Sequence, residues 1–502
     1  MLNRLIDWSV TNRLLVVIAL LALTAAAIFI IPRLNLDAFP DVTNVQVSIN
    51  TEAPGLAPEE VEQLITFPIE AVMYALPDVE EVRSISKTGL SGITVVFKEG
   101  TDIYFARQLV FERLQSAKEL IPEGVGTPGI GPNTSGLGQV YQYLLLADAE
   151  TGYDVMALRS LNDWVVKVLL MPVDGVTEVL SFGGDVKQYQ VNLNPSRLLA
   201  YGLSQDAVVQ ALEANNSNAG GWYMNRGQEQ LVIRGVGWLN PDEQGLEQLR
   251  QIPLKTVAGT VIKVSDVASV EFGSEIRQGA VTMARRTEDG GVEFLGEVVS
   301  GIVLKRMGAN TKVTIDGINE RIALIQQALP KGVRFESIYD QADLIEQAVN
   351  TVVKALIEAF VFIVIVLALF LFNVRAVVLV LISIPLSVGM ALAVMAYNGL
   401  SANLMSLGGL AVAIGMMVDG AVVMMENIFK HLSQPDRRHD AQHAELLPPD
   451  DKDPYDVAQD ANVGLRIQIA SREVAKPVFF AVTIIMVVFA PLFSLEGVEG
   501  KL

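Results

Sequence analysis

Long apolar stretches separated by polar ones dominate the hydropathy pattern of this chain. A helix crosses a bilayer core with about 20 apolar residues, and five stretches approach or exceed that length. They are residues 14–31, 355–372, 376–397, 404–429 and 477–493. The first follows Arg4 and Arg13 and contains three consecutive alanines, as a signal peptide would. It is too long for a cleaved signal core, so we expect a retained membrane anchor.

Basic residues flank the apolar stretches unevenly, and this asymmetry predicts an orientation. Arg4 and Arg13 precede the first stretch, Arg375 separates the second from the third, and further Lys and Arg residues lie between the fourth and fifth. The connection 398–403 has no basic residue. Because cytoplasmic loops carry the excess of Lys and Arg, we expect a cytoplasmic amino terminus and an outer location for residues 32–349.

The outer region alternates between the periods of strands and helices. Its first part reads strand–helix–strand–strand–helix, the order of a split βαβ unit. The expected strands are 45–50, 81–86 and 93–97, with helices from Pro58 and over 102–117. A second unit has expected helices at 158–170 and 311–329 and strands at 177–181, 188–191 and 333–338. We interpret residues 181–273, rich in Gly and Asn, as an insertion into that second unit.

Composition narrows the function classes. The chain of 502 residues has no cysteine and a formal charge of -19. The absence of cysteine excludes disulfides, iron–sulfur clusters and thiolate metal sites. An acidic, hydropathic chain is a poor nucleic-acid binder, and no Gly-x-x-x-x-Gly-Lys-Ser/Thr stretch indicates ATP as the energy source.

Two carboxylates within the fourth apolar stretch are the strongest functional candidates. Asp419 lies near its middle, where an ionised carboxylate costs at least about 2.5 kcal/mol. Desolvation favours the protonated form, so such a group can take up a proton and lose it when a cation approaches. Glu426 lies seven residues later on the same helix face. It is either the entry point of a proton relay through Asp419 or a carboxylate that extends toward water at the membrane surface. The alternative to proton transfer by Asp419 is a structural ion pair or an interhelical hydrogen bond. Glu358, in the second apolar stretch, fits a position at the membrane interface.

The same stretch is rich in methionine and glycine. Thioethers are soft ligands that select Cu(I) and, by the same softness, Ag(I), although methionines in an apolar helix are usually filler. Met417 and Met424 share a face and Met405 lies one face over. The glycines are expected to let neighbouring helices approach closely; they are Gly408, Gly409, Gly415 and Gly420.

Three histidines lie in or beside the polar stretch that follows, and we expect them to be solvated. They are His431, His439 and His443. His439 and His443 have the spacing of a metal pair on a helix, but the surrounding Pro- and Asp-rich sequence favours a loop.

Several stretches together resemble the heavy-metal efflux branch of the resistance–nodulation–division transporters. The matching stretches are Asp37-Ala38-Phe39-Pro40-Asp41-Val42, Ala53-Pro54-Gly55, Glu99-Gly100-Thr101-Asp102, Leu158-Arg159-Ser160-Leu161-Asn162-Asp163-Trp164, and Met405-Ser406-Leu407-Gly408-Gly409 through Glu426-Asn427. The resemblance implies a proton-driven homotrimer in the inner membrane, with a periplasmic membrane-fusion adaptor and an outer-membrane channel as partners. It gives Asp419 the role of proton-relay aspartate and implies no cofactor.

With this resemblance, the expected fold is a membrane α-helical bundle plus an α+β periplasmic domain, built from split βαβ (ferredoxin-like) porter subdomains with an inserted docking subdomain. The expected boundaries are 1–32 for an amphipathic start and the first span, 33–134 for the first porter subdomain, 135–180 with 274–343 for the second, 181–273 for the docking subdomain, 344–372, 376–397 and 403–429 for the next three spans, 430–476 for a cytoplasmic loop, and 477–495 for the fifth span.

The resemblance also bears on the cargo. Drug exporters of the superfamily usually carry two adjacent aspartates, whereas Gly420 follows Asp419 here. Divalent-cation exporters usually have another aspartate where this chain has Ala413. Copper and silver exporters have methionines matching Met405, Met417 and Met424, although a further relay methionine falls near Ile276. We therefore expect export of Cu(I) or Ag(I), with divalent cations (Zn, Co, Cd, Ni) or organic molecules as alternative cargoes.

The alternative to a transporter is a protein of a different functional class, a membrane scaffold or sensor that transports nothing. Relatives continue with a sixth span and a second half that supplies partners for the relay aspartate, whereas this chain ends at Leu502. We therefore expect the complete gene product to be longer and this part alone to be unable to transport.

Overall fold

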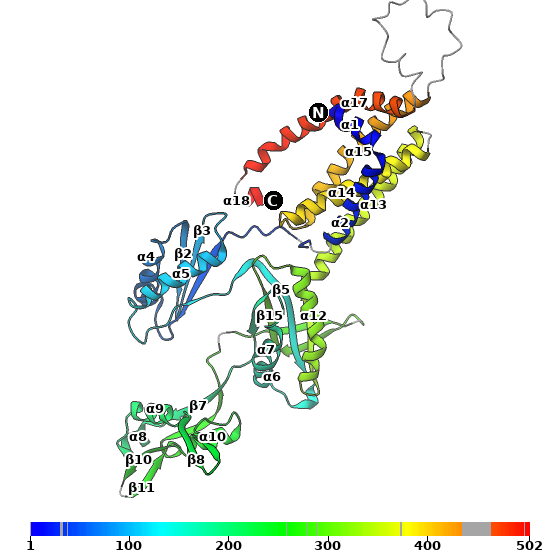
Figure 1. Ribbon diagram of the computed structural model, residues 1–502. Coiled ribbons are helices and arrows are strands. Elements are labelled where there is room, and N and C mark those ends of the chain that lie inside the picture. The colour runs from blue at the N-terminus through cyan, green and yellow to red at the C-terminus, as the bar shows by residue number, and fades with distance from the viewer. Residues whose placement is uncertain are drawn as a thin grey trace, which may run out of the picture.

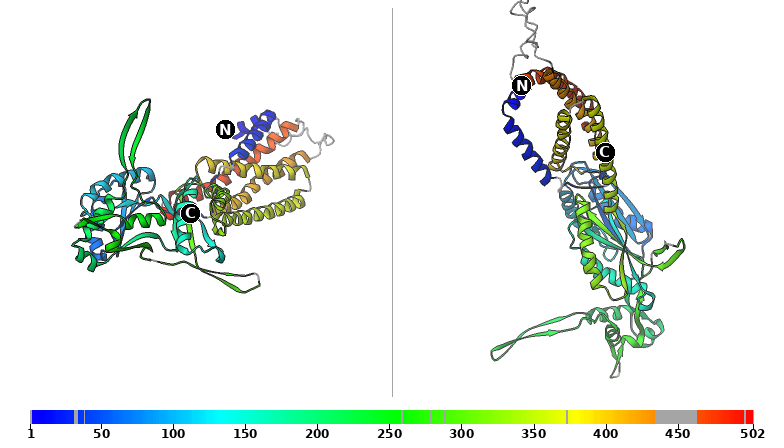
Figure 2. Two further views of the ribbon diagram at one scale, coloured as in Figure 1. Left: turned by 90° about the horizontal axis from the view of Figure 1, so that it is seen from below. Right: turned by 90° about the vertical axis from the view of Figure 1, so that its right-hand side faces the viewer.

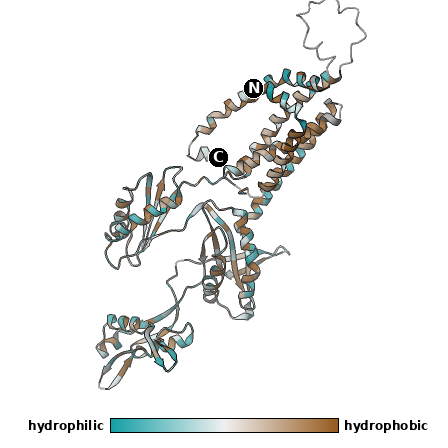
Figure 3. Ribbon diagram, in the orientation of Figure 1, coloured by the Kyte–Doolittle hydropathy of each residue, from teal (hydrophilic) through white to brown (hydrophobic). Residues whose placement is uncertain are grey.

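Five long helices form the membrane part of the protein, which is described here from a computed structural model. The structure describes residues 2–30, 34–37, 39–257, 259–277, 279–287, 289–371, 374–433, 463–495 and 497–501. The helices long and apolar enough to cross a membrane are α2 (Arg13–Ile30), α13 (Gln341–Leu371), α14 (Val374–Tyr397), α15 (Leu404–Ser433) and α17 (Val463–Phe489). They gather at one end of the molecule (Figure 1) and carry most of its apolar ribbon (Figure 3).

Two of these helices are longer than their apolar stretches. Helix α13 begins directly after strand β16 and runs unbroken into the membrane part. Helix α17 begins at Val463 and continues through Pro477, where the sequence predicted its start. A proline is tolerated there because neighbouring groups in a membrane helix can satisfy the freed carbonyl. A short helix α1 (Leu2–Thr11) precedes α2, while a 3-10 turn (Ala490–Ser494) and α18 (Gly497–Lys501) follow α17.

The first extramembrane subdomain is a four-stranded antiparallel sheet with helices packed against it. In chain order it contains β1 (Gln46–Glu52), α3 (Pro58–Val61), a π-turn (Glu62–Thr66), α4 (Phe67–Met73), β2 (Val79–Lys87), β3 (Leu90–Phe97), α5 (Ile103–Lys118) and β4 (Gly129–Ile130). The strand order is β2-β3-β1-β4. Alternate residues of β1, such as Val47 and Ile49, point into a core shared with the helices.

The second subdomain repeats this arrangement with an insertion in the middle. It contains β5 (Thr134–Ala147), a 3-10 turn (Ala149–Thr151), α6 (Val155–Leu161), a π-turn (Asn162–Val166), α7 (Lys167–Leu170), β6 (Val176–Phe182), β15 (Val299–Arg306), α12 (Thr311–Ala328) and β16 (Val333–Asp340). The strand order is β16-β5-β15-β6, all pairs antiparallel. In both subdomains the first strand along the chain therefore lies between the third and fourth, which is the split βαβ order.

The inserted subdomain lies at the far end from the membrane helices (Figure 1). It contains β7 (Lys187–Leu193), α8 (Pro195–Tyr201), α9 (Gln205–Ala214), β8 (Ala219–Arg226), β9 (Glu229–Gly235), α10 (Glu243–Arg250), β10 (Pro253–Val257), β11 (Thr260–Lys263), α11 (Val264–Val267) and β12 (Ala268–Ser274). The hairpin β8–β9 projects away from it (Figure 2) and all of its residues are exposed. A second hairpin, β13 (Thr282–Arg286) with β14 (Val292–Glu297), leads back to β15.

One strand prediction was wrong in its placement. The sequence assigned residues 188–191 to the second split βαβ unit, but they lie in β7, which pairs with β12 in the inserted subdomain. The sheet of the second subdomain is instead completed by β5 and β15, neither of which was predicted. Strand β5 begins with scattered glycines and ends in a continuous apolar run, so it lacks the alternation by which half-buried strands are recognised.

A buried polar network surrounds the π-turn of the second subdomain. Asn162 is fully buried; its Oδ1 accepts a hydrogen bond from the Tyr143 hydroxyl at 2.7 Å, and its Nδ2 donates to Ser181 Oγ at 2.8 Å. Ser181 Oγ in turn donates to Asp163 Oδ1 at 2.5 Å. Burial raises the pKa of Tyr143, which keeps the phenol protonated as the donor. The network therefore fixes the π-turn against both β5 and β6.

We expect Asn162→Ala to destabilise the second subdomain by about 2 kcal/mol, because the buried Tyr143 hydroxyl would lose its acceptor. By hydrogen-exchange mass spectrometry of the purified protein, amides of β6 should exchange roughly 30-fold faster. Asn192→Ala is the matched control, since Asn192 is exposed and its side chain donates to Glu271 on a neighbouring strand. Equal exchange in both variants would contradict a structural role for the buried network.

Candidate functional site

Helix α15 carries all five residues predicted to take part in transport, and its start is tightly fixed. Asn403 is buried, and its Oδ1 accepts hydrogen bonds from the backbone N–H groups of Met405 at 3.0 Å and Ser406 at 2.9 Å. Ser406 Oγ accepts in return from the backbone N–H of Asn403 at 2.9 Å. This reciprocal pair satisfies N–H groups that a helix start otherwise leaves unpaired. The cap sets the position of every later residue on the helix.

Two faces of α15 are covered by other helices of the chain. Val418 is buried in a cluster with residues of α13 and α14, to which Ile414, Ala421, Val422 and Met425 also belong. A different face contacts α17, where a Cβ on Gly420 would lie 3.3 Å from Val478 Cγ1.

Close helix approach holds for only one of the four glycines singled out in the sequence. Among the described residues, nothing lies within 4 Å of a Cβ built on Gly408, Gly409 or Gly415. Gly420, by contrast, is where α17 comes near α15. The expectation of close packing at the other three positions is therefore not met within the described part of this chain.

Asp419 and Glu426 occupy a third face, which the described part of the chain leaves uncovered. Both side chains are exposed, and seven residues, close to two turns, separate them. Met416, 39% exposed, belongs to the same stripe. Within the described ranges, no ion pair holds Asp419. An aspartate at this depth with no cation beside it is stable in hydrocarbon only when protonated or when another segment brings a partner.

The candidate methionines are divided between different faces of α15. Met417 and Met424 are half-buried; at 100° per residue, Met417 points about 160° away from Asp419. Met405, 50% exposed, lies at the start of the helix on the side nearer Asp419. Met417 and Met424 are about 10 Å apart along the axis, too far to ligate one ion together. Any ligand role for these three side chains would therefore lie at separate levels of the helix.

Met405 lines a cavity of about 530 Å³ at the junction between the membrane helices and the second subdomain. Met395, Asp37 and Lys305 also line it. This cavity has thioethers and charged groups in one lining at the start of α15. Among the described residues, no cluster of three or more His, Cys, Asp or Glu side chains could hold a metal ion.

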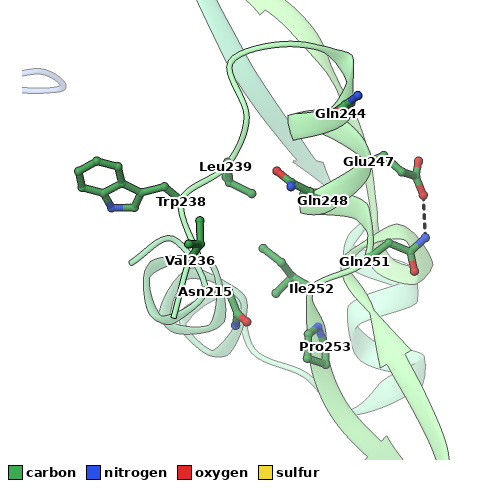
Figure 4. A pocket seen from close by; sticks show the side chains of 11 residues that line it. Asn215, Val236, Trp238, Leu239, Gln244, Glu247, Gln248, Gln251, Ile252 and Pro253 are labelled. Carbon is green, nitrogen blue, oxygen red and sulfur yellow. Dashed lines mark hydrogen bonds between the residues drawn. The ribbon is translucent and has the colours of Figure 1, made fainter. Parts of the chain in front are cut away.

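A second cavity, of about 500 Å³, lies in the inserted subdomain and has a different character (Figure 4). Its lining is apolar and amide-rich, with Trp238 and Ile252 on its walls and Glu247 as its one charged group. Hydrogen bonds from Gln251 and Arg250 lower the pKa of Glu247. With no thioether, imidazole or thiolate in its lining, the cavity does not have the chemistry of a soft-metal site.

Sequence reasoning missed a polar cluster at the opposite end of α15. His431, predicted to be solvated, is only 4% exposed, and its Nε2 lies 3.0 Å from Glu473 Oε2 on α17. Asn427 Nδ2 donates to the same oxygen at 3.2 Å and to the Ala470 carbonyl at 2.8 Å. The spacing of Asn427 and His431, four residues apart, was a signal for one polar helix face. His439 and His443 lie outside the described residues.

The comparisons with known proteins agree on one family. The family model of the AcrB/AcrD/AcrF family matches residues 5–502. The cobalt-zinc-cadmium resistance protein CzcA of Cupriavidus metallidurans is 39% identical over 508 residues, which cover 100% of this chain and 45% of that protein. The cation efflux system protein CusA of Escherichia coli (strain K12) is 37% identical over 503 residues, covering 99% of this chain and 45% of that protein.

A solved structure has the same fold. The crystal structure of a heavy metal efflux pump (crystal form II) matches with a TM-score of 0.81 at 32% sequence identity, covering 99% of this chain and 45% of that one. The chain therefore spans about 45% of the length of these relatives.

We expect His431→Ala to lower the stability of the α15–α17 contact by about 1–3 kcal/mol, because Glu473 would lose its buried imidazole partner. The purified protein in detergent should unfold at a lower temperature. Lys430→Ala is the control, since Lys430 is exposed on the adjacent position. An unchanged melting temperature for His431→Ala would show that the imidazole does not hold the two helices together.

Proposed function

Because the chain belongs to the AcrB/AcrD/AcrF family, we propose that it is the inner-membrane part of a pump that exports heavy-metal cations on the energy of proton influx. One observation carries this proposal. A single aspartate, Asp419, lies midway along a membrane helix on the face that the described chain leaves open. The similarity of the whole chain to heavy-metal efflux proteins supplies the class of cargo.

The chemistry of the proposed proton step follows from the position of Asp419. In hydrocarbon its carboxyl group is more stable protonated, and the approach of a cationic side chain favours the ionised form. Alternating between these two states binds a proton on one side of the membrane and releases it on the other. We propose that the cation comes from outside the residues described here, at the open face of α15. Glu426, on the same face toward the end of the helix, would pass protons to or from Asp419.

For the cargo we propose Cu(I) or Ag(I). Met405, Met417 and Met424 supply soft ligands at three levels of α15, and thioethers select these ions over hard divalent cations. Met417 and Met424 point away from Asp419, and Met405 lies about 21 Å from it along the helix axis. These positions fit a path in which metal and proton never share a site. Separate paths would allow the two movements to be linked through the shape of the helix bundle, without direct competition for one ligand.

Divalent cations are the second candidate cargo. The cobalt-zinc-cadmium resistance protein is 39% identical to this chain, and CusA is 37% identical, so overall similarity does not favour the soft ions. Under this reading the methionines of α15 are packing residues. The two readings differ in which metal ions the protein protects against.

We further propose a homotrimer that works with a periplasmic membrane-fusion adaptor and an outer-membrane channel, with the amino terminus in the cytoplasm. The exposed hairpin β8–β9 supports self-association, because Trp222 is 82% and Val232 is 68% exposed on a projecting arm. Apolar side chains on such an arm are typical of a segment that another subunit covers.

We expect Asp419→Asn to reduce cation export at least tenfold, because an amide can no longer take up and release a proton. Export is measured as metal tolerance of a sensitive strain that expresses the complete gene, with protein amount checked by immunoblot. Glu426→Gln is the comparison, and a smaller loss there would fit a role at the edge of the relay. Undiminished tolerance with Asp419→Asn would favour a scaffold or sensor over a pump.

Replacing the three candidate methionines with leucine should remove tolerance to copper and silver while leaving protein amount unchanged, because leucine keeps the volume but not the thioether. Met416→Leu is the matched control on the same helix. Each strain is tested against copper, silver, zinc, cobalt and cadmium. Protection by the unmodified protein against zinc or cobalt, without protection against copper or silver, would assign the divalent cargo instead.

A further inference from the structure

The segment that follows the first membrane helix forms a strap between two distant parts of the chain. The strap comprises residues 34–37, and its Leu34 side chain is buried. On one side it meets the loop 398–403 that leads into α15, and on the other it meets the start of α12 in the second subdomain. The strap is therefore placed to link a membrane helix with an extramembrane subdomain.

Backbone hydrogen bonds join the strap to the start of α15. Ala402 donates its N–H to the Asn35 carbonyl at 2.8 Å, and Asp37 donates its N–H to the Ala402 carbonyl at 3.3 Å. Leu36 and Ala402 form a parallel β-bridge. Asn403, which caps α15, comes directly after Ala402. Any shift of α15 along its axis therefore acts directly on the strap.

Side chains join the strap to the second subdomain. Asp37 Oδ1 accepts a hydrogen bond from Thr311 Oγ1 at 2.5 Å and lies 3.7 Å from Lys305 Nζ. Thr311 is the first residue of α12, and Lys305, only 7% exposed, lies on β15. Asn310 caps α12 with its Oδ1 and donates its Nδ2 to the Leu34 carbonyl at 3.3 Å. A carboxylate is also favoured at the positive end of a helix such as α12.

Among the described residues of the strap, Asp37 alone makes both sets of contacts. Its backbone N–H bonds to Ala402, and its carboxylate contacts Thr311 and Lys305. The second subdomain has a separate, covalent support in α13, which continues from β16 without a break. Two supports at different points form a lever, because a movement of α15 relative to α13 must tilt the subdomain that both hold.

We propose that Asp37 is a positioning residue for transport that couples movement of α15 to the tilt of the second subdomain. The proposal rests on the proposed function in one respect, that the protonation of Asp419 moves α15. Asp419 lies about 22 Å along the helix from Leu404, and a helix transmits a shift over this distance as a rigid rod. The strap converts that shift into a movement of α12 and β15.

The test uses a single introduced cysteine as the reporter. These 502 residues contain no cysteine, and any cysteine in the rest of the complete gene product is first replaced by serine. Val313→Cys places the reporter in the first turn of α12, at a position that is 53% exposed. The complete gene product, purified in detergent, is labelled with a maleimide. The labelling rate of this cysteine is compared between the protein that retains Asp419 and the Asp419→Asn variant, which imitates the protonated state. We expect the rate to change at least threefold between the two.

The same comparison is then made with Asp37→Ala, which should reduce the difference to less than 1.5-fold. Thr311→Val should act like Asp37→Ala, and Thr311→Ser, which keeps the hydroxyl, should restore the difference. Asp41→Ala is the matched control, since Asp41 is exposed and its carboxylate accepts from the backbone N–H of Thr43. A merely structural role for Asp37 would change both labelling rates and leave their ratio intact.

The coupling role is overturned if the ratio survives Asp37→Ala, or if Asp419→Asn leaves labelling unchanged while Asp37 is present. The proposed cargo is judged separately, by metal tolerance. If the protein protects against none of the metals but the ratio of labelling rates still depends on Asp37, the proposed function is wrong and the coupling role of Asp37 stands.

Discussion

The free energy of a carboxylate in hydrocarbon is the constraint on which the rest of this molecule depends. Asp419 has no compensating charge among the described residues. In hydrocarbon its carboxyl group is therefore stable only with a bound proton or beside a cation from another segment. Contacts at both ends and along one side of α15 place that group. The reciprocal cap at Asn403 fixes the helix at one end, and the cluster around His431 fixes it at the other. The apolar side packs on α13 and α14, which leaves the acidic face open.

The extramembrane part depends on a different property, the independence of two similar subdomains that are attached to the membrane helices. Each is a four-stranded antiparallel sheet with the same strand order, and each buries an apolar core of its own. Independent cores allow the subdomains to move as rigid bodies, because movement between them does not open either core. The contacts of the second subdomain with the membrane part, through α13 and through Asp37, are therefore the places where such movement would be controlled.

The sequence predicted part of this architecture, and physical reasons explain why it did not predict the rest. Membrane spans depend on composition alone, so the five helices were predicted, and alternation predicted the split βαβ order of the first subdomain but not the sheet of the second. Helical period placed Asp419 and Glu426 on one face, but it could not show which face other helices cover. His431 was misjudged because a polar sequence context does not reveal a helix that packs over it. The contact of Asp37 with Thr311 joins residues 274 positions apart, which no local pattern encodes.

The π-turns shared by the two subdomains have a consequence for how their helices can be recognised. The buried positions Val61, Ile65, Ile69 and Met73 in the first, and Leu158, Asn162, Val166 and Leu170 in the second, recur at intervals of four. In an ideal α-helix of 3.6 residues per turn, such a repeat drifts by about 40° at each step. The wider turn absorbs this drift and keeps all four positions on the sheet. In both subdomains a four-residue repeat of buried positions thus coincides with one widened turn, which lets a short helix keep the same side chains against its sheet along its whole length.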